Sequence, residues 1–329
     1  MPTALRQIKL FSNLDDIEWR DFARGLKPVN CAAGETLLHQ GAPPGGAYIL
    51  ESGKVEVVTR LPGGGEMFHT ELGPGEVFGE VGLIDAVQRT ASVKALTPLS
   101  AHYLERRHFQ GALAQLDTAA FKVMRQLLGL LYARLRTLTA KLIELAEPGP
   151  APSYDPSAPA PLADASRASD CSFDYRLFLS ILPFFNAFSA PDLGFIDSHA
   201  HTLELPRGTP VFTESWPARA CFIVLRGALV LYAERGGRRQ QLAVFGPGCI
   251  VGANALVLEL AHDTSCEVRS DALVLELTRD VFAMIFRGVS ELSLAFLNAL
   301  AAQLAQTLTR ANHDLIRETG YRRLGRRSA

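Results

Sequence analysis

The sequence predicts a mainly β protein with flanking helices, arranged as two tandem jelly-roll β-barrels that are each followed by a long helix. Three observations lead to this fold class. Short β-prone runs alternate with glycine and proline between Gly34 and Leu104, as in barrels and sandwiches. An apolar pattern with helical spacing follows them. The same order of features then recurs further along the chain.

The N-terminal part of the chain predicts short helices, and a set of short strands after them. Leu10, Leu14, Ile17 and Phe22 recur at helical spacing within the first 30 residues. After Gly34, β-prone runs are separated by glycine-rich turns, which is the usual punctuation of antiparallel strands. Three of these runs are residues 48–50, 54–58 and 68–72.

A long helix with an unbroken heptad seam follows the strands. Its apolar residues step alternately by four and three positions, the a/d spacing of a coiled coil. A globular helix usually has a broader stripe of period 3.6, so we expect a parallel homodimer through the long helices. Packing of this helix on its own barrel is the alternative. The seam consists of Met124, Leu128, Leu131, Leu135, Leu138, Leu142 and Leu145.

A segment rich in proline and alanine interrupts the helical pattern and predicts a semi-extended, solvated linker. After it the chain repeats itself. Under one constant shift, Gly79, Leu83 and Phe109 fall on Gly252, Leu256 and Phe282. The predicted domains are therefore residues 1–146, a linker at 147–170 and a second copy of the fold at 171–329.

The stretch from Gly75 to Val93 predicts a site for one phosphate and one sugar hydroxyl. It has the pattern of a strand end, a glycine turn, a short helix that begins near Gly79, a loop and another strand. The unpaired N–H groups and positive dipole at a helix start favour an anion. Arg89 can add a forked positive charge at the same place. Glu80 needs a hydrogen-bond donor there, such as a ribose 2′-hydroxyl.

These residues resemble the phosphate-binding cassette of the cyclic nucleotide-binding domain family. That family includes catabolite activator protein and the regulatory subunit of cyclic AMP-dependent protein kinase. Its pattern is Phe-Gly-Glu-x-(Ala/Gly)-Leu, a short gap, and Arg-(Thr/Ala/Ser)-Ala-(Ser/Thr)-Val. Both parts are present, as Phe78-Gly79-Glu80-Val81-Gly82-Leu83 and Arg89-Thr90-Ala91-Ser92-Val93. A barrel with an ordinary surface ion pair is the alternative interpretation.

The resemblance implies a role for each cassette residue. Arg89 would bind an exocyclic phosphate oxygen together with the N–H groups of Gly82 and Thr90, and Glu80 would accept from the ribose 2′-hydroxyl. Thr139 on the long helix would meet the base. The expected ligand is cyclic AMP, with cyclic GMP possible, and no metal is expected. The expected ligand-binding residues are Leu72, Phe78, Gly79, Glu80, Val81, Gly82, Leu83, Arg89, Thr90, Ala91 and Thr139.

The second copy lacks the charged residues of this cassette. Ala253 takes the place of Glu80, and His262 takes the place of Arg89. Removal of one partner of a buried charged pair costs about 3–5 kcal/mol, or two to three orders of magnitude in affinity. We therefore expect the second copy to have lost the nucleotide cavity and to serve as a structural or partner-binding module, or to hold another ligand.

Composition and motifs exclude several classes of protein. A net charge of −1 gives no global basic field for nucleic acid, and few residues follow the second long helix, so we expect no helix-turn-helix domain. The five cysteines lack metal or disulfide spacing, which favours a reducing compartment. We expect no signal peptide and no membrane span. No residue set has the pattern of a catalytic site.

Together these observations predict a non-enzymatic, cytoplasmic cyclic nucleotide sensor. The first copy binds cyclic AMP and relays this to the second copy or to an unknown protein partner, without DNA or a membrane. Two alternatives stay open at this point. One is a scaffold whose barrels bind a protein partner without any nucleotide, and the other is a receptor for a cyclic dinucleotide.

Overall fold

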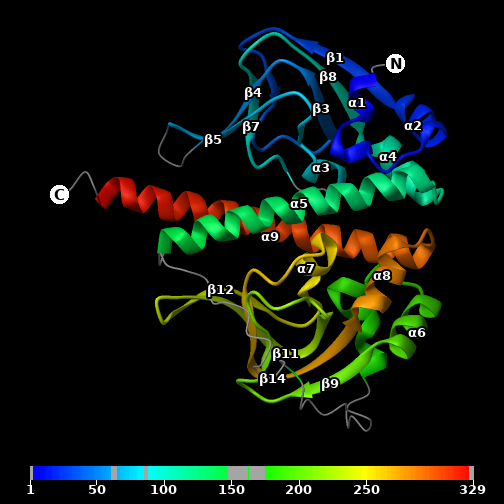
Figure 1. The fold of residues 1–329 in the computed structure, drawn as a ribbon, viewed down its shortest axis with the longest axis vertical. Helices are drawn as coiled ribbons and strands as arrows, with labels where there is room; N and C mark the ends of the chain where they lie inside the picture. The colour runs from blue at the N-terminus through cyan, green and yellow to red at the C-terminus, as the bar shows by residue number, and fades with distance from the viewer. Residues whose placement is uncertain (1–2, 61–64, 85–87, 147–161, 163–174, 326–329) are drawn as a thin grey trace. The chain divides into compact units, whose positions relative to one another are not determined.

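The computed structural model describes residues 3–60, 65–84, 88–146, 162 and 175–325 (Figure 1). The chain forms two compact units, residues 1–128 with 289–294 and residues 129–288 with 295–329. The division falls inside the long helix α5, Thr118–Ala146, so the second half of this helix belongs to the second unit. The predicted limits at residues 146 and 171 stay a prediction. Except for Leu162, the predicted linker lies outside the described residues.

The first unit contains two four-stranded antiparallel sheets with helices beside them. The strand orders are β1-β8-β3-β6 and β2-β7-β4-β5, which is the jelly-roll arrangement that the sequence predicts. Apolar side chains fill the space between the sheets, among them Leu50, Val55 and Phe78. The strands are β1 (Leu26–Cys31), β2 (Thr36–Leu38), β3 (Gly46–Ser52), β4 (Val55–Arg60), β5 (Glu66–Leu72), β6 (Val77–Phe78), β7 (Ser92–Ala95) and β8 (Leu99–Glu105).

The predicted short N-terminal helices are present in the first unit. Asp15 accepts from the N–H groups of Ile17 and Glu18, and the Glu18 side chain accepts from the N–H of Asp15, a capping box that starts α2. Phe22 of α2 lies edge-on to Phe109, with ring centroids 6.4 Å apart. The helices are α1 (Thr3–Arg6), η1 (Lys9–Phe11), α2 (Asp16–Ala23), α3 (Val81–Ile84) and α4 (Arg106–Ala114).

The second unit is built around one six-stranded antiparallel sheet. Its main path is β10-β14-β11-β12, with β9 paired to β14 and β13 paired to β11. The elements are η2 (Tyr175–Ile181), η3 (Pro183–Phe185), α6 (Ala190–His199), β9 (His201–Leu205), β10 (Pro210–Phe212), β11 (Ala220–Arg235), β12 (Arg238–Phe245), β13 (Ile250–Val251), α7 (Ala253–Leu258), β14 (Ser265–Thr278), α8 (Arg279–Arg287) and the part of α9 (Glu291–Gly325) from Ala295 onward.

The two units share the hydrogen bonds that hold their corresponding turns. In the first unit, the N–H of Gly75 donates to Leu50 O at 2.8 Å. In the second unit, the N–H of Gly248 donates to Val224 O at 2.8 Å. Both glycines have positive φ, 89° and 78°, a conformation that favours glycine over other residues. The structure thus contains the same fold twice, as the internal repeat predicts.

The predicted heptad seam is packed inside a single chain along much of its length. Met124, Leu128, Leu131 and Leu138 are each no more than 8% exposed. Met124 and Leu128 belong to the first unit, whereas Leu131 and Leu138 belong to the second. The homodimer through the seam and its alternative, packing of the helix on its own barrel, both stay predictions. The other seam leucines are partly exposed.

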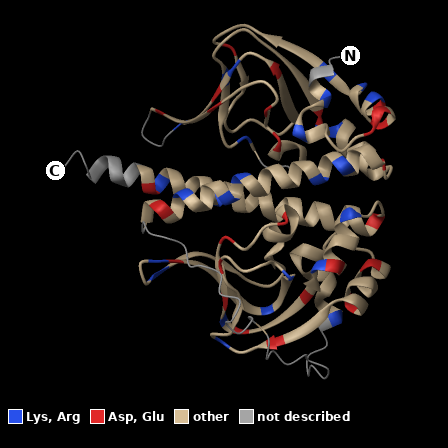
Figure 2. Ribbon diagram, in the orientation of Figure 1, with Lys and Arg blue, Asp and Glu red and all other residues tan. Residues whose placement is uncertain are grey.

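Helix α9 has an unusual composition among the described helices. Its window Glu291–Thr319 is long and apolar enough for a bilayer span by length and composition alone, and half of the most apolar part is buried in the protein. Helices of globular cores have the same property, so this feature does not by itself assign a membrane role. Figure 2 shows acidic and basic residues interspersed over the strands and helices of both units.

Candidate functional site

The first candidate site is the turn and short helix at residues 79–84 together with Arg89, which we call the first site. Arg89 is only 9% exposed. Its Nη1 donates to Gly79 O at 2.7 Å, and its Nη2 donates to Gly46 O at 2.6 Å. A guanidinium has five N–H donors, so these two bonds fix the fork and leave other donors for an anion. The sequence motif thus places its arginine against the glycine turn.

Two glycines make room for this guanidinium. A Cβ atom on Gly82 would lie 2.5 Å from Arg89 Nη1, and one on Gly79 would lie 2.9 Å from the same atom. Gly79 also has φ +74°, which side chains rarely adopt. The glycines of the motif are therefore required by the position of Arg89 as well as by the turn.

The surroundings of Arg89 are apolar and aromatic. Burial lowers the pKa of its guanidinium, while Tyr103, Tyr48 and Glu80 act in the opposite direction. Burial likewise raises the pKa of Tyr48, whose ring is stacked on Phe78 with centroids 5.2 Å apart. An arginine in these surroundings keeps its charge because its ordinary pKa is so high. It is a poorly hydrated cation, which favours contact with an anion.

The structure brings most of the predicted residues together. Glu80 is 7% exposed and lies one residue before α3. Leu72 and Ala91 pack against the barrel core. Phe78 and Leu83 are buried, whereas Val81 and Thr90 are half-buried.

Two details of the structure concern the roles implied for Gly82 and Thr139. The N–H of Gly82 donates to Gly79 O at 3.0 Å inside the turn, so it is already used in this structure. Thr139 belongs to the second unit, where it lines a cavity. Its predicted contact with the base in the first site therefore stays a prediction.

Sequence reasoning missed Gly46 and the pair of tyrosines around Arg89. Tyr48 and Tyr103 face each other across neighbouring strands, with ring centroids 4.8 Å apart. A Cβ atom on Gly46 would lie 2.2 Å from Leu104 O, so only glycine fits there. The glycine pair at residues 45 and 46 was the available signal, but spacing alone did not connect it to Arg89.

The second unit holds residue 262 by the same backbone bonds as residue 89. Gly41 N–H donates to Arg89 O at 2.8 Å, and Arg89 N–H donates to Ala42 O at 3.0 Å. At the corresponding place, Ser215 N–H donates to His262 O at 2.8 Å, and His262 N–H donates to Trp216 O at 3.0 Å. The main chain of the cassette is therefore preserved where its charged side chains are not.

The His262 side chain cannot replace the arginine. Its ring is stacked on Phe212, with centroids 4.0 Å apart and planes at 9°, and the residue is 4% exposed. Burial, with a smaller contribution from Arg136, lowers the pKa of His262 to about 4. The imidazole is therefore neutral near pH 7 and offers no positive charge to a phosphate.

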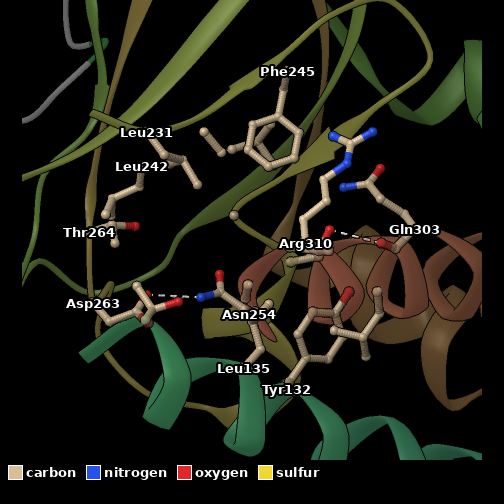
Figure 3. Close-up of a pocket in the computed structure, with 18 of the residues that line it drawn as sticks. Tyr132, Leu135, Leu231, Leu242, Phe245, Asn254, Asp263, Thr264, Gln303 and Arg310 are labelled. Atoms are coloured by element: carbon tan, nitrogen blue, oxygen red, sulfur yellow. Dashed lines mark hydrogen bonds between the residues drawn. The ribbon is translucent and has the colours of Figure 1, made fainter. Parts of the chain in front are cut away.

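The charged cassette residues are absent from the second unit, and the predicted loss of a cavity for a cyclic nucleotide there stays a prediction. A cavity of about 390 Å³, which we call the second cavity, lies beside the altered cassette. Apolar residues from the sheet and from helices α5, α7 and α9 line it, so the barrel keeps its hollow without Glu80 or Arg89 counterparts. Figure 3 shows several of its residues, including Tyr132, Leu135, Leu242 and Phe245.

A comparison with known protein families agrees with this fold and with these two sites. The family model for the cyclic nucleotide-binding domain matches residues 28–116 and 202–288, once in each unit. The chain belongs to this family. It carries two cyclic nucleotide-binding domains in tandem and is homologous to regulators related to catabolite activator protein and to kinase regulatory subunits.

Curated relatives match one part of the chain. A CRP-like cAMP-activated global transcriptional regulator of Mycobacterium tuberculosis is 30% identical over 145 residues, 44% of this chain and 63% of the regulator. A cAMP-dependent protein kinase regulatory subunit of Dictyostelium discoideum is 31% identical over 116 residues, 34% of this chain and 36% of the subunit. The matched part thus spans less than two thirds of these relatives.

The chain is also similar to several solved structures. Thermus thermophilus catabolite activator protein is 30% identical, with 42% of this chain and 63% of that chain covered and a TM-score of 0.39. The regulatory domain of Toxoplasma gondii PKA, crystallised with cAMP, is 19% identical, with 85% and 88% covered and a TM-score of 0.32. Our proposal for function therefore depends on the residues of the first site.

Proposed function

We propose that this protein is a non-enzymatic cyclic nucleotide sensor, and that its first unit binds cyclic AMP. The observation that carries this proposal is the buried Arg89, which is held at the glycine turn by Gly79 O and Gly46 O. A buried, preorganised guanidinium favours a phosphate monoanion, because charge-assisted hydrogen bonds are strong where water is excluded.

The assignment of cyclic AMP adds Glu80 to this argument. Its carboxylate is buried close to Arg89, so it would repel a second phosphate but can accept from a ribose hydroxyl. One phosphate with one sugar hydroxyl is the chemistry of a cyclic mononucleotide. On this basis we propose ten ligand-binding residues in the first unit: Leu72, Phe78, Gly79, Glu80, Val81, Gly82, Leu83, Arg89, Thr90 and Ala91.

The relay from ligand to partner is part of the proposal. Ligand binding would shift the population between two arrangements of the chain, by no more than its difference in affinity for the two. We propose that this shift changes the binding of a protein partner, and that the protein is a homodimer through its long helices. A cytoplasmic location is proposed as well, and the four described cysteines, which are free, agree with a reducing compartment.

The proposal is tested by titration calorimetry of the full chain with cyclic AMP, cyclic GMP and cyclic di-GMP. We expect cyclic AMP to bind, and the Arg89→Glu variant to lose about 100-fold or more in affinity, because removal of a buried charged partner costs about 3–5 kcal/mol. The control is Arg20→Ala, a change of an exposed arginine on α2, which we expect to leave affinity unchanged.

Two outcomes would contradict the proposal. Tight binding of cyclic AMP by the Arg89→Glu variant would show that the first site is not the binding site. Absence of binding for all three nucleotides by the unaltered chain would favour the scaffold. Sedimentation velocity with and without cyclic AMP tests the homodimer separately, since a ligand-independent monomer would exclude it.

A further inference from the structure

The first unit has a cavity of its own between the loop before β3 and the start of α4, which we call the loop cavity. Its volume is about 580 Å³, which lies in the range of small-molecule sites. All of its residues belong to the first unit, and none of them is a predicted ligand-binding residue. The lining residues are Pro44, Gly45, Tyr103, Glu105, Arg106, Arg107 and Gln110.

The loop cavity has a surplus of positive charge. Arg106 is half-buried and Arg107 is exposed, and neither guanidinium has an ion pair or a side-chain hydrogen bond to any residue that the structure describes. Glu105 also lines the cavity, but its carboxylate is paired with Lys27. Arg106, Arg107 and Lys27 against Glu105 leave two positive charges in excess, so the loop cavity favours an anion.

The second unit has a different arrangement at the corresponding position. Arg279 corresponds to Arg106, but its Nε donates to Ala218 O at 3.1 Å and its Nη2 donates to the same oxygen. Asp280 takes the position of Arg107 and adds a negative charge. At this position, two neighbouring guanidiniums without a polar partner among the described residues therefore occur in the first unit alone.

A phosphate group fits this arrangement better than a carboxylate. Each guanidinium has five N–H donors in a fork that matches the oxygens of either group. A phosphate monoester has a charge of about −1.5 to −2 at pH 7 and three acceptor oxygens, whereas a carboxylate has a single charge. The excess of two positive charges in the loop cavity therefore favours a phosphate dianion.

Two contacts join the loop cavity to the first site. The loop that forms its wall continues into Gly46, whose carbonyl oxygen accepts from Arg89 Nη2 at 2.6 Å. Gln110 Nε2 donates to Leu83 O, in the short helix α3 of the first site, at 2.8 Å. A ligand in the loop cavity would therefore contact the segments that hold both the arginine and the helix of the first site.

We propose that the loop cavity binds a phosphate dianion, as free phosphate or as the head of a small monoester, and that its binding weakens nucleotide binding at the first site. Arg106 and Arg107 donate to the phosphate oxygens. Two anions bound at sites that share one loop repel each other, so each ligand lowers the affinity of the other by the same factor. This coupling rests on the proposed function of the first site, whereas phosphate binding does not.

Phosphate binding is tested by calorimetry of the full chain without nucleotide, at low ionic strength because salt screens exposed charges. The ligands are inorganic phosphate and glycerol 3-phosphate, with glycerol as the uncharged control. We expect a phosphate ligand to bind at one site per chain, with the tighter of the two identifying the source of the phosphate, and glycerol not to bind. Absence of binding for both phosphates would overturn the proposal.

A double variant, Arg106→Gln with Arg107→Gln, locates the site. We expect at least tenfold weaker phosphate binding, because the charge-assisted hydrogen bonds are lost. The control is Arg20→Gln with Arg24→Gln, which removes the same charge from exposed positions of the first unit and should change the affinity by less than twofold. Unchanged binding in the Arg106→Gln, Arg107→Gln variant would show that phosphate binds elsewhere and would overturn the proposal.

A measurement on the unaltered chain avoids any question about folding. The side-chain Nε–H resonances of Arg106 and Arg107 should shift in NMR spectra as the phosphate ligand is added. If neither resonance moves at saturation, the two arginines are not the binding residues.

The coupling is tested by titration of cyclic AMP with and without saturating phosphate ligand, with ionic strength matched by sodium chloride. We expect the phosphate to lower cyclic AMP affinity at least twofold in the unaltered chain and to have no effect in the Arg106→Gln, Arg107→Gln variant. Equal affinity with and without phosphate, in a chain that binds both ligands, would contradict the coupling. Absence of cyclic AMP binding would contradict the proposed function and with it the coupling, while the phosphate titration tests the loop cavity by itself.

Discussion

Residues 89 and 262 occupy the same position in two copies of one fold, but their side chains differ in charge. Each makes the same pair of backbone hydrogen bonds to a neighbouring loop. Arg89 brings a buried positive charge to the glycine turn, whereas His262 stacks on Phe212 and stays neutral. The comparison teaches that the barrel keeps the same main-chain hydrogen bonds at this position with two side chains of different charge.

The difference extends to the small residues around each position. Gly82 is required because Arg89 Nη1 occupies the space of its Cβ atom. At the corresponding position of the second unit Ala255 is buried, and no guanidinium competes for its space. A methyl group at this position goes with a histidine in place of the arginine, and the second cassette forms the start of α7 beside a cavity.

The largest expected effect is a pH dependence of the second unit that arises from His262. The unfolded chain protonates His262 near its ordinary pKa of 6.5, whereas the folded chain keeps it neutral down to about 4. The unfolded state therefore binds more protons in this window, and stability falls as the pH falls. Between pH 7 and pH 5 we expect a loss of about 2 kcal/mol that His262→Gln removes.

This loss is measured by hydrogen exchange of β14 amides in the full chain at both pH values, with intrinsic exchange rates taken into account. The control is His199→Gln, which changes an exposed histidine at the end of α6 and should leave the pH dependence as it is. The same loss in the His262→Gln variant would show that His262 does not titrate as the structure indicates.

A smaller expected effect tests whether Gly82 makes room for the Arg89 guanidinium. Gly82→Ala places a methyl group 2.5 Å from Arg89 Nη1, and overpacking of this kind costs about 1–3 kcal/mol. We expect about a tenfold loss in cyclic AMP affinity by calorimetry. The matched variant Ala255→Gly in the second unit should leave this affinity unchanged. An affinity of Gly82→Ala within twofold of the unaltered chain would show that Arg89 does not need the space.

The smallest expected effect concerns the long helix. Thr139→Ala should change cyclic AMP affinity by no more than about twofold, because Thr139 lines the second cavity. Calorimetry measures the affinity of this variant, and the loss of affinity in the Arg89→Glu variant serves as the reference for a large effect. A tenfold loss of cyclic AMP affinity would instead support the predicted contact between Thr139 and the base.

The sequence alone identified the fold class, the internal repeat and the cassette. These are features of contiguous residues: the glycine turn, Glu80 and Arg89 lie within a few positions of one another, and strand and helix periods are local. The replacement of Arg89 by His262 also followed from the sequence, because one constant shift aligns the two copies. Local spacing was enough for each of these predictions.

Only the tertiary structure decided what these residues contact. The bond from Arg89 to Gly46 O joins positions 43 residues apart, and no spacing rule connects them. The second half of α5 packs in the second unit, where Arg136 Nη1 donates to Ala261 O at 2.9 Å. The second cavity exists because sheet and helices hold its walls apart whatever the cassette residues are. The sequence gives the type and local spacing of each side chain, but the space around that side chain depends on packing between distant segments.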